Sequence, residues 1–386
     1  MQEVALSRQD AAIPGLLTRM AIVVLFAGFG ICARYLAYRL AIPDADPAGF
    51  FKVMCRWDCE WYVRLAESGY DPFPTPRMIN AGNWAFFPLY PMTIGVLRHL
   101  TGLPTLELSA AVSVLISMGT ALVAWPLLGR SLRAFTLFAA FILAGPFSFY
   151  FTTFFTETLF IFLNVAVFAA LQRRQWLVAG VLAAGLSATR IVGVFIVFAI
   201  LWEVWVTHRE RGGTWRDFIP ATLARPELVL TFAIAPLGLF AYMAFLHLHI
   251  GDALAFQHVQ RAWGRPSGLP PVFVWNGLTS LPGEGWWPTA SQFLAAAAVA
   301  AYALIVGLVL TGRIGMAIYA FVALTLPLFA GLASMVRFVA GMGPMSLLLA
   351  DLFGRSRVGF AVGLLLVLVG GWYGTFGWLD WNLALV

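Results

Sequence analysis

The sequence predicts an all-α polytopic membrane protein, and both composition and segment length point to that class. Of its 386 residues, 61% are hydrophobic and the mean hydropathy is +0.85, which is more apolar surface than a water-soluble globule can bury. Apolar runs recur at roughly 20 residues, the length that a helix needs to cross a hydrocarbon core about 30 Å thick. We therefore expect a single transmembrane domain over residues 1-386.

Hydropathy and loop charge together predict about eleven spans. They cover residues 16-40, 105-129, 134-151, 155-171, 175-189, 191-207, 227-250, 289-311, 314-332, 337-353 and 358-379. The first span contains Arg34 and Arg39 and no small-residue cleavage site, so we expect a retained signal anchor. Arg190 interrupts the pair at 175-207, where two half-length helices that meet at a polar break are the alternative to two crossings.

A cytoplasmic N-terminus satisfies the positive-inside rule at every short loop. The inside loops then collect Arg130, Arg133, Arg173, Arg174, Arg209, Arg211, Arg216, Arg225, Arg313, Arg355 and Arg357. Segment 84-100 would invert every later loop if it were a span, so we expect it to lie along the outer face as an interfacial helix. Two long external loops remain, 43-104 and 251-288, and we expect a working surface to face outward.

Charge and cysteine content limit the partners. The formal net charge of +6 comes from basic residues in separate short loops and not from one patch, so we expect no nucleic-acid partner. Cys32, Cys55 and Cys59 are too few for a disulfide framework or a zinc site, and a Cys55 to Cys59 bridge is the less favoured alternative to free thiols. The histidine-containing stretch 247-265 has no H-x-x-x-H pair, so we expect no metal and no cofactor there, while a divalent ion elsewhere stays open.

The stretch RWDCEWYVRLAESGY, residues 56-70, concentrates charge in a chain of which only 11% is charged. Wound as a helix, it places Glu60, Arg64 and Glu67 on one self-neutralising stripe. Asp58 lies away from that stripe and has no cation at i+3 or i+4. Two interpretations stay open: Asp58 caps the helix, or it is catalytic.

Three further charged residues lie in or beside apolar runs, where charge is costly and often functional. Glu157 begins a span in FTTFFTETLF, where it either caps a helix or takes part in function. Arg190 in LSATRIVGVF and Arg337 in LASMVRFVAG are single cations on the predicted outer side. Each either extends to lipid headgroups or binds an anion, and the forked guanidinium suits phosphate.

RWDCEWYVRLAESGY, NWAFFPLYP, FTTFFTETLF and SATRIVGV follow one another in an order that resembles the PIG-V family of mannosyltransferases. GDALAFQ and the Arg337-Phe338 pair also look like that family. Its members often have R-S-N-G where this chain has RIVG at 190-193, so any role of that Asn does not carry over. The resemblance implies a GT-C glycosyltransferase fold with an active site on the lumenal or periplasmic side and Asp58 as the catalytic acid.

The implied reaction moves a mannosyl residue, with inversion, from polyprenyl-phosphate mannose to a lipid-linked or glycolipid acceptor. One carboxylate suffices, because the phosphate leaving group needs cations and not a proton. The donor-binding candidates are Arg190, Arg337, Arg261 and Glu157, and aromatic candidates for the groove are Trp57, Trp61, Tyr62, Phe86, Phe87 and Tyr90. We expect a bacterial inner-membrane protein in contact with membrane lipids, with its site on the periplasmic face. The rival interpretations are a flippase for a lipid-linked sugar, an enzyme for another polyprenyl-linked sugar and a non-catalytic scaffold.

Overall fold

The computed structural model describes residues 15-74, 81-281, 289-380, 382 and 385, so parts of both predicted external loops, 75-80 and 282-288, lie outside the described residues. All secondary-structure elements within these ranges are helices. Five are long and apolar enough to cross a membrane: α1 (Leu16–Ala41), α5 with its 3-10 extension (Thr105–Leu128), α9 with the turn before it (Ile191–Glu210), α15 (Ala290–Leu310) and α19 (Arg357–Leu379). A sixth candidate is the bent pair α11 (Pro226–Ile234) and α12 (Leu237–Ile250).

The other predicted spans are apolar helices too short to cross at full length. They are α6 (Leu132–Ala144), α7 (Glu157–Gln172), α8 (Trp176–Ser187), α16 (Ile314–Leu328) and α18 (Gly343–Gly354). At about 1.5 Å per residue, a helix of this size reaches roughly 18 to 24 Å. The predicted count of about eleven therefore stays a prediction, while five to six candidate spans are present.

Proline and glycine explain where the helices depart from the predicted boundaries. α6 ends at Ala144 and not at 151, because Gly145 and Pro146 follow it. Pro236 lies between α11 and α12, which meet at a bend of 42°. The predicted span 337-353 is divided into α17 (Met335–Ala340) and α18 by the turn at Gly341. The break predicted at Arg190 is present, since α8 ends at Ser187 and a 3-10 turn starts at Ile191.

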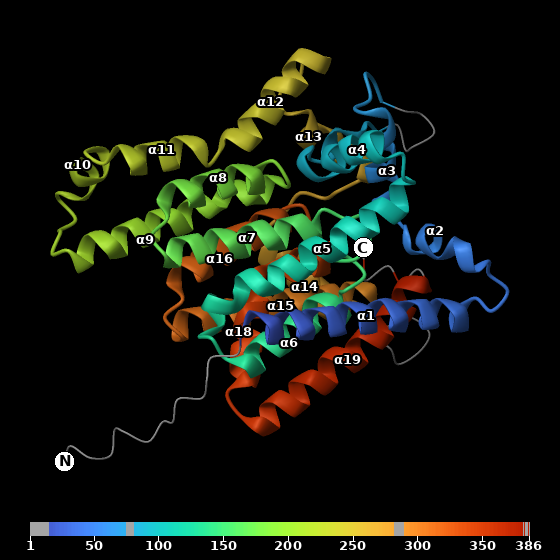
Figure 1. Ribbon diagram of the computed structural model, residues 1–386. Coiled ribbons are helices and arrows are strands. Elements are labelled where there is room, and N and C mark those ends of the chain that lie inside the picture. The colour runs from blue at the N-terminus through green and yellow to red at the C-terminus, as the bar shows by residue number, and fades with distance from the viewer. Residues whose placement is uncertain (1–14, 75–80, 282–288, 381, 383–384, 386) are drawn as a thin grey trace.

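The long helices lie side by side in one bundle (Figure 1). α1 packs on α6 and α19, while α7 packs between α5 and α8. Large apolar side chains on α1, α15 and α19 stay more than half exposed, among them Leu17, Leu310 and Leu365. Such faces are stable only in an apolar solvent, so the chain is an integral membrane protein.

The short helices of the predicted external loops gather at one end of the bundle. α3 (Cys59–Ser68), α4 (Leu89–Thr101) and α13 (Ala255–His258) lie together there, with α2 (Phe50–Met54) nearby, whereas α10 (Phe218–Leu223) lies at the opposite end (Figure 1). α4 has 13 residues and follows Pro88, as expected for a helix that does not cross. The remaining short helix, α14 (Pro270–Thr279), packs on α15.

Asp71 links distant parts of the first predicted external loop. Its carboxylate accepts hydrogen bonds from Arg64 Nη2 at 2.6 Å and from the Asn83 backbone N–H at 3.1 Å. Its own N–H donates to Asn83 Oδ1, and its carbonyl accepts from the Trp84 indole at 2.7 Å. Arg64, which the sequence places on a stripe with Glu60 and Glu67, thus also pairs with Asp71.

We expect Asp71→Ala to lower the free energy of unfolding by about 2 kcal/mol, because the buried Asn83 N–H would lose its acceptor. Thermal unfolding in detergent, followed by tryptophan fluorescence, measures the change. Asp252→Ala is the control, since Asp252 is an exposed acid that bonds His258 in the other external loop. Equal shifts for the two variants would contradict the role given to Asp71.

Candidate functional site

Four charged side chains from distant parts of the chain meet in one ion-pair cluster: Asp58, Glu157, Arg190 and Arg337. Arg337 donates from Nε to Glu157 Oε1 at 2.6 Å and from Nη1 to Asp58 Oδ2. Arg190 donates from Nη1 to the same Glu157 oxygen at 2.7 Å. The sequence analysis named these two acids and two arginines as individual candidates, and the structure brings them into direct contact.

A short cross-linked turn holds Asp58 in place. α2 ends at Met54, α3 begins at Cys59, and a disulfide joins Cys55 to Cys59 across the turn. Free thiols were the favoured prediction, so that interpretation is wrong. Inside the turn, Trp57 has φ 57°, a left-handed conformation that is costly for a bulky residue and is found where the surrounding structure enforces it.

The carboxylate of Asp58 is oriented but not enclosed. Asp58 occupies the N-cap position of α3, yet its side chain makes no capping hydrogen bond, so the capping interpretation is wrong. Oδ2 faces Arg337, and Oδ1 accepts no hydrogen bond from the described residues. With 28% of the side chain exposed, one carboxylate oxygen is fixed by a cation and the other is accessible.

Glu157 is the buried counter-charge of the cluster. It is the first residue of α7, its side chain is fully buried, and Oε1 accepts from both arginines. Oε2 is also buried and has no hydrogen-bond partner among the described residues. Glu157 was predicted to bind the donor, and in the structure its direct partners are Arg190 and Arg337.

Each arginine of the cluster lies next to a backbone segment that departs from regular α-helix. Arg190 immediately precedes the 3-10 turn between α8 and α9, where Gly193 approaches the Leu186 carbonyl too closely to admit a Cβ. Arg337 lies on α17, directly after Ser334, which has φ 65°. Aromatic rings cover both guanidinium groups: Phe155 lies 5.0 Å from that of Arg337, and Phe338 lies 4.9 Å from that of Arg190.

The second external loop brings a different arginine from the one predicted. Arg261, one of the predicted phosphate ligands beside Arg190 and Arg337, has an exposed side chain on the turn Val259–Trp263. Arg265 instead reaches the loop before α17, where it donates to the Ala333 carbonyl and to Ser334 Oγ, each at 3.3 Å. In the sequence, nothing but its positive charge distinguished Arg265 as a candidate site residue.

The predicted groove aromatics divide between packed clusters. Trp61 stacks on Phe86 with ring centroids 5.5 Å apart, and Tyr62 meets Phe86 edge-on. Burial raises the pKa of Tyr62 to about 12, so its hydroxyl stays protonated and pairs with Thr156 Oγ1 at 3.1 Å. Tyr90 belongs to the same cluster, since it and Tyr62 both contact the ring of Phe154. Phe87 packs in a second cluster, against Tyr242 and Phe256.

All five of these side chains, Trp61, Tyr62, Phe86, Phe87 and Tyr90, are less than a tenth exposed, and Trp57 is half-buried. The five buried side chains are therefore part of the packed interior and not of an open surface. Trp61 also contacts Trp263, which joins α3 to the second external loop. The two external loops therefore support one common surface.

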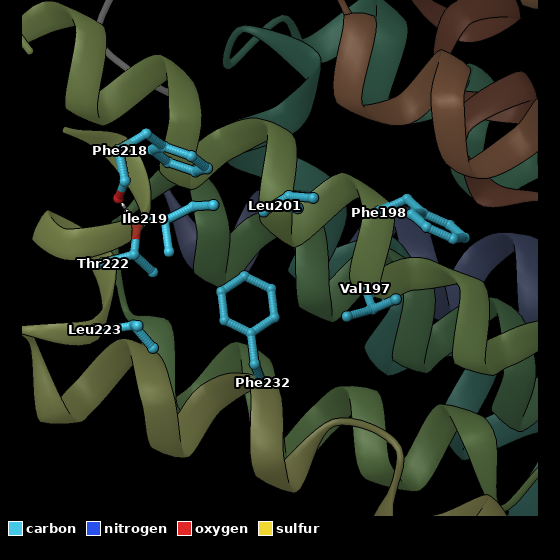
Figure 2. A pocket seen from close by; sticks show the side chains of 8 residues that line it. All are labelled: Val197, Phe198, Leu201, Phe218, Ile219, Thr222, Leu223 and Phe232. Atoms are coloured by element: carbon cyan, nitrogen blue, oxygen red, sulfur yellow. Dashed lines mark hydrogen bonds between the residues drawn. The ribbon is translucent and has the colours of Figure 1, made fainter. Parts of the chain in front are cut away.

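A pocket of about 270 Å³ lies away from this cluster, between α9, α10 and α11. Figure 2 shows side chains from all three helices converging on it, with the Phe232 ring near its centre. Thr222 carries the one polar side chain among its lining residues. The pocket has no group that could carry chemistry, so the ion-pair cluster is the candidate site.

No known family model matches the chain, and no curated protein is significantly similar to it. The fold and the site define a helical integral membrane protein with a charged cluster that joins the turn before α3, the start of α7, the break after α8 and α17.

We expect Glu157→Gln to destabilise the protein by about 3 to 5 kcal/mol, because it removes the buried counter-charge of two arginines. Denaturant titration of the purified protein measures the loss. Glu107→Gln, at an exposed position in the first turn of α5, is the control and is expected to change stability by less than about 0.5 kcal/mol. A loss for Glu157→Gln no larger than the control's would show that Glu157 is not a required counter-charge.

We expect the double variant Cys55→Ser, Cys59→Ser to lose about 2 kcal/mol of stability, the loop-closure contribution of so short a cross-link. A reductant should lower the melting temperature of the wild type to that of the double variant and leave the variant unchanged. Cys32→Ser, which replaces the free cysteine, is the control. A wild type that is insensitive to reductant would contradict the cross-link's role.

Proposed function

We propose that the protein is a membrane glycosyltransferase that moves a mannosyl residue from polyprenyl-phosphate mannose to a lipid-linked or glycolipid acceptor. The observation that carries the proposal is the state of Asp58. One of its carboxylate oxygens is held by Arg337 while the other is accessible and accepts nothing from the described residues. A general base needs this combination of fixed orientation and a free lone pair.

In the proposed reaction, Asp58 Oδ1 takes the proton of an acceptor hydroxyl. The acceptor oxygen then forms a bond to the anomeric carbon, while the bond from that carbon to the phosphate oxygen breaks. The electron pair leaves with the polyprenyl phosphate. Because attack and departure occur on opposite faces of the sugar, the anomeric configuration inverts. A second carboxylic acid is unnecessary, since phosphate leaves without protonation.

The arginines beside Asp58 support the same chemistry. Charge develops on the phosphate as the glycosidic bond breaks, and fixed cations in a water-poor site stabilise it more than water does. Arg190 and Arg337 are fixed by Glu157 and covered by aromatic rings, so little reorganisation is needed. The ordered motifs that resemble PIG-V mannosyltransferases run through the same residues and supply the choice of mannose.

The disulfide supports a site on the periplasmic face of a bacterial inner membrane. Disulfides persist in oxidising compartments, and Cys55 and Cys59 flank Asp58 in the loop that the positive-inside rule places outward. The loop charges and the cross-link are independent observations that favour one orientation.

The test is to reconstitute the purified protein with radiolabelled polyprenyl-phosphate mannose and a glycolipid extract. Appearance of label in a new glycolipid supports the enzyme. Movement of intact labelled donor between leaflets without transfer would favour a flippase, and neither event would favour a scaffold.

We expect Asp58→Asn to lower kcat by at least about a hundredfold, because the amide cannot accept the acceptor's proton. Transfer of label by protein reconstituted at equal amounts measures the effect. Glu60→Gln, an exposed acid in the first turn of the same helix, should retain wild-type activity. Equal transfer by Asp58→Asn and wild type would rule out Asp58 as the base.

A further inference from the structure

Each acid of the ion-pair cluster already holds at least one arginine through one carboxylate oxygen. Glu157 Oε1 accepts from Arg190 and from Arg337, while Asp58 Oδ2 accepts from Arg337. Two negative charges therefore face two positive charges, and the cluster of four is balanced. An anion that approached these four side chains alone would have to compete with two carboxylates already in place.

Arg265 is a third cation beside this balanced set, and its direct partners are neutral. Its two hydrogen bonds go to the Ala333 carbonyl and to Ser334 Oγ, and both are long at 3.3 Å. Burial lowers the pKa of its guanidinium, although arginine stays charged in proteins. A partly buried charge that holds only neutral partners is costly, so an anion placed here is stabilised.

Arg265 is joined to the segment that carries Arg337. Its charge interacts with that of Asp58 and, unfavourably, with those of Arg337 and Arg190. Ser334, which it contacts, immediately precedes the helix that carries Arg337. Adding Arg265 gives three arginines against two acids, so the enlarged site has one positive charge to spare.

We propose that Arg265 is the residue that binds the phosphate of the polyprenyl carrier, in place of the predicted Arg261. This inference rests on the proposed function for the identity of the carrier. The guanidinium has five N–H donors, and the described residues take two, so the rest can reach phosphate oxygens. Arg337 and Arg190 then keep their ion pairs with Asp58 and Glu157 and lie beside the bound phosphate.

The experiment measures binding without sugar transfer. The probes are farnesyl phosphate and its uncharged alcohol farnesol, titrated into purified full-length protein in detergent by calorimetry, with inorganic phosphate as a third probe. We expect wild type to bind farnesyl phosphate at least about tenfold more tightly than farnesol, the scale of charge-assisted hydrogen bonds. Inorganic phosphate should bind more weakly than farnesyl phosphate, and equal affinity would overturn the assignment to a lipid phosphate.

Arg265→Gln should abolish the preference for farnesyl phosphate over farnesol. Arg265→Lys, which keeps the charge, should retain part of it, and Arg261→Gln, an exposed arginine in the same loop, should retain all of it. Melting temperatures identify any variant that fails to fold. If Arg265→Gln fails to fold, Arg265→Lys decides: its affinity for farnesyl phosphate should lie between the wild type's affinity for farnesyl phosphate and the wild type's affinity for farnesol. An Arg265→Gln variant that binds farnesyl phosphate like wild type would overturn the inference.

The outcome is separable from that of the proposed function. If wild type discriminates farnesyl phosphate through Arg265 but transfers no labelled mannose, the anion site stands and the transferase proposal fails. If mannose is transferred and Arg265→Gln changes neither phosphate binding nor the KM for the donor, the transferase stands and the role of Arg265 fails.

Discussion

The double ion pair of Arg337 is the interaction on which the candidate site depends. It joins α17 to the start of α7 and to the turn before α3, segments 180 and 279 residues away in the sequence. Removing such charges from water costs several kcal/mol per ion, and only close, well-oriented partners compensate for that cost. The irregular backbone at Ser334, the disulfide turn and the position of Glu157 at a helix start all serve to bring these partners together.

The class of the fold and the common side of the charged residues could be predicted from the sequence. Apolar run length depends only on the thickness of the bilayer, and loop arginines report orientation, so both are local signals. That reasoning placed Asp58, Glu157, Arg190 and Arg337 at one end, and the structure brings them into contact. The span count was harder, because short helices such as α7 and α18 are largely buried in the bundle and need not cover the full bilayer.

The pairings themselves could not be predicted. A single sequence does not say which of several arginines meets which acid across 33 or 180 residues. Arg64 illustrates the point: helical spacing suggested neighbours on α3, and gave no sign of its ion pair with Asp71 beyond the end of that helix. Arg261 and Arg265 differ by four positions and look equivalent in the sequence, yet only Arg265 reaches the loop that carries Arg337.

Charge conservation explains why acids and arginines would occur together in such a site. With Arg265 included, three arginines and two acids leave a surplus of one positive charge, which matches the single negative charge of a phosphodiester donor. When Asp58 takes a proton, the site gains one unit of positive charge, while the phosphate, released from the sugar, gains one unit of negative charge. The sum is unchanged at each stage of the proposed reaction, so no uncompensated charge appears in a region of low dielectric constant. A site built of arginines alone would hold the donor more tightly but would leave no base for the acceptor.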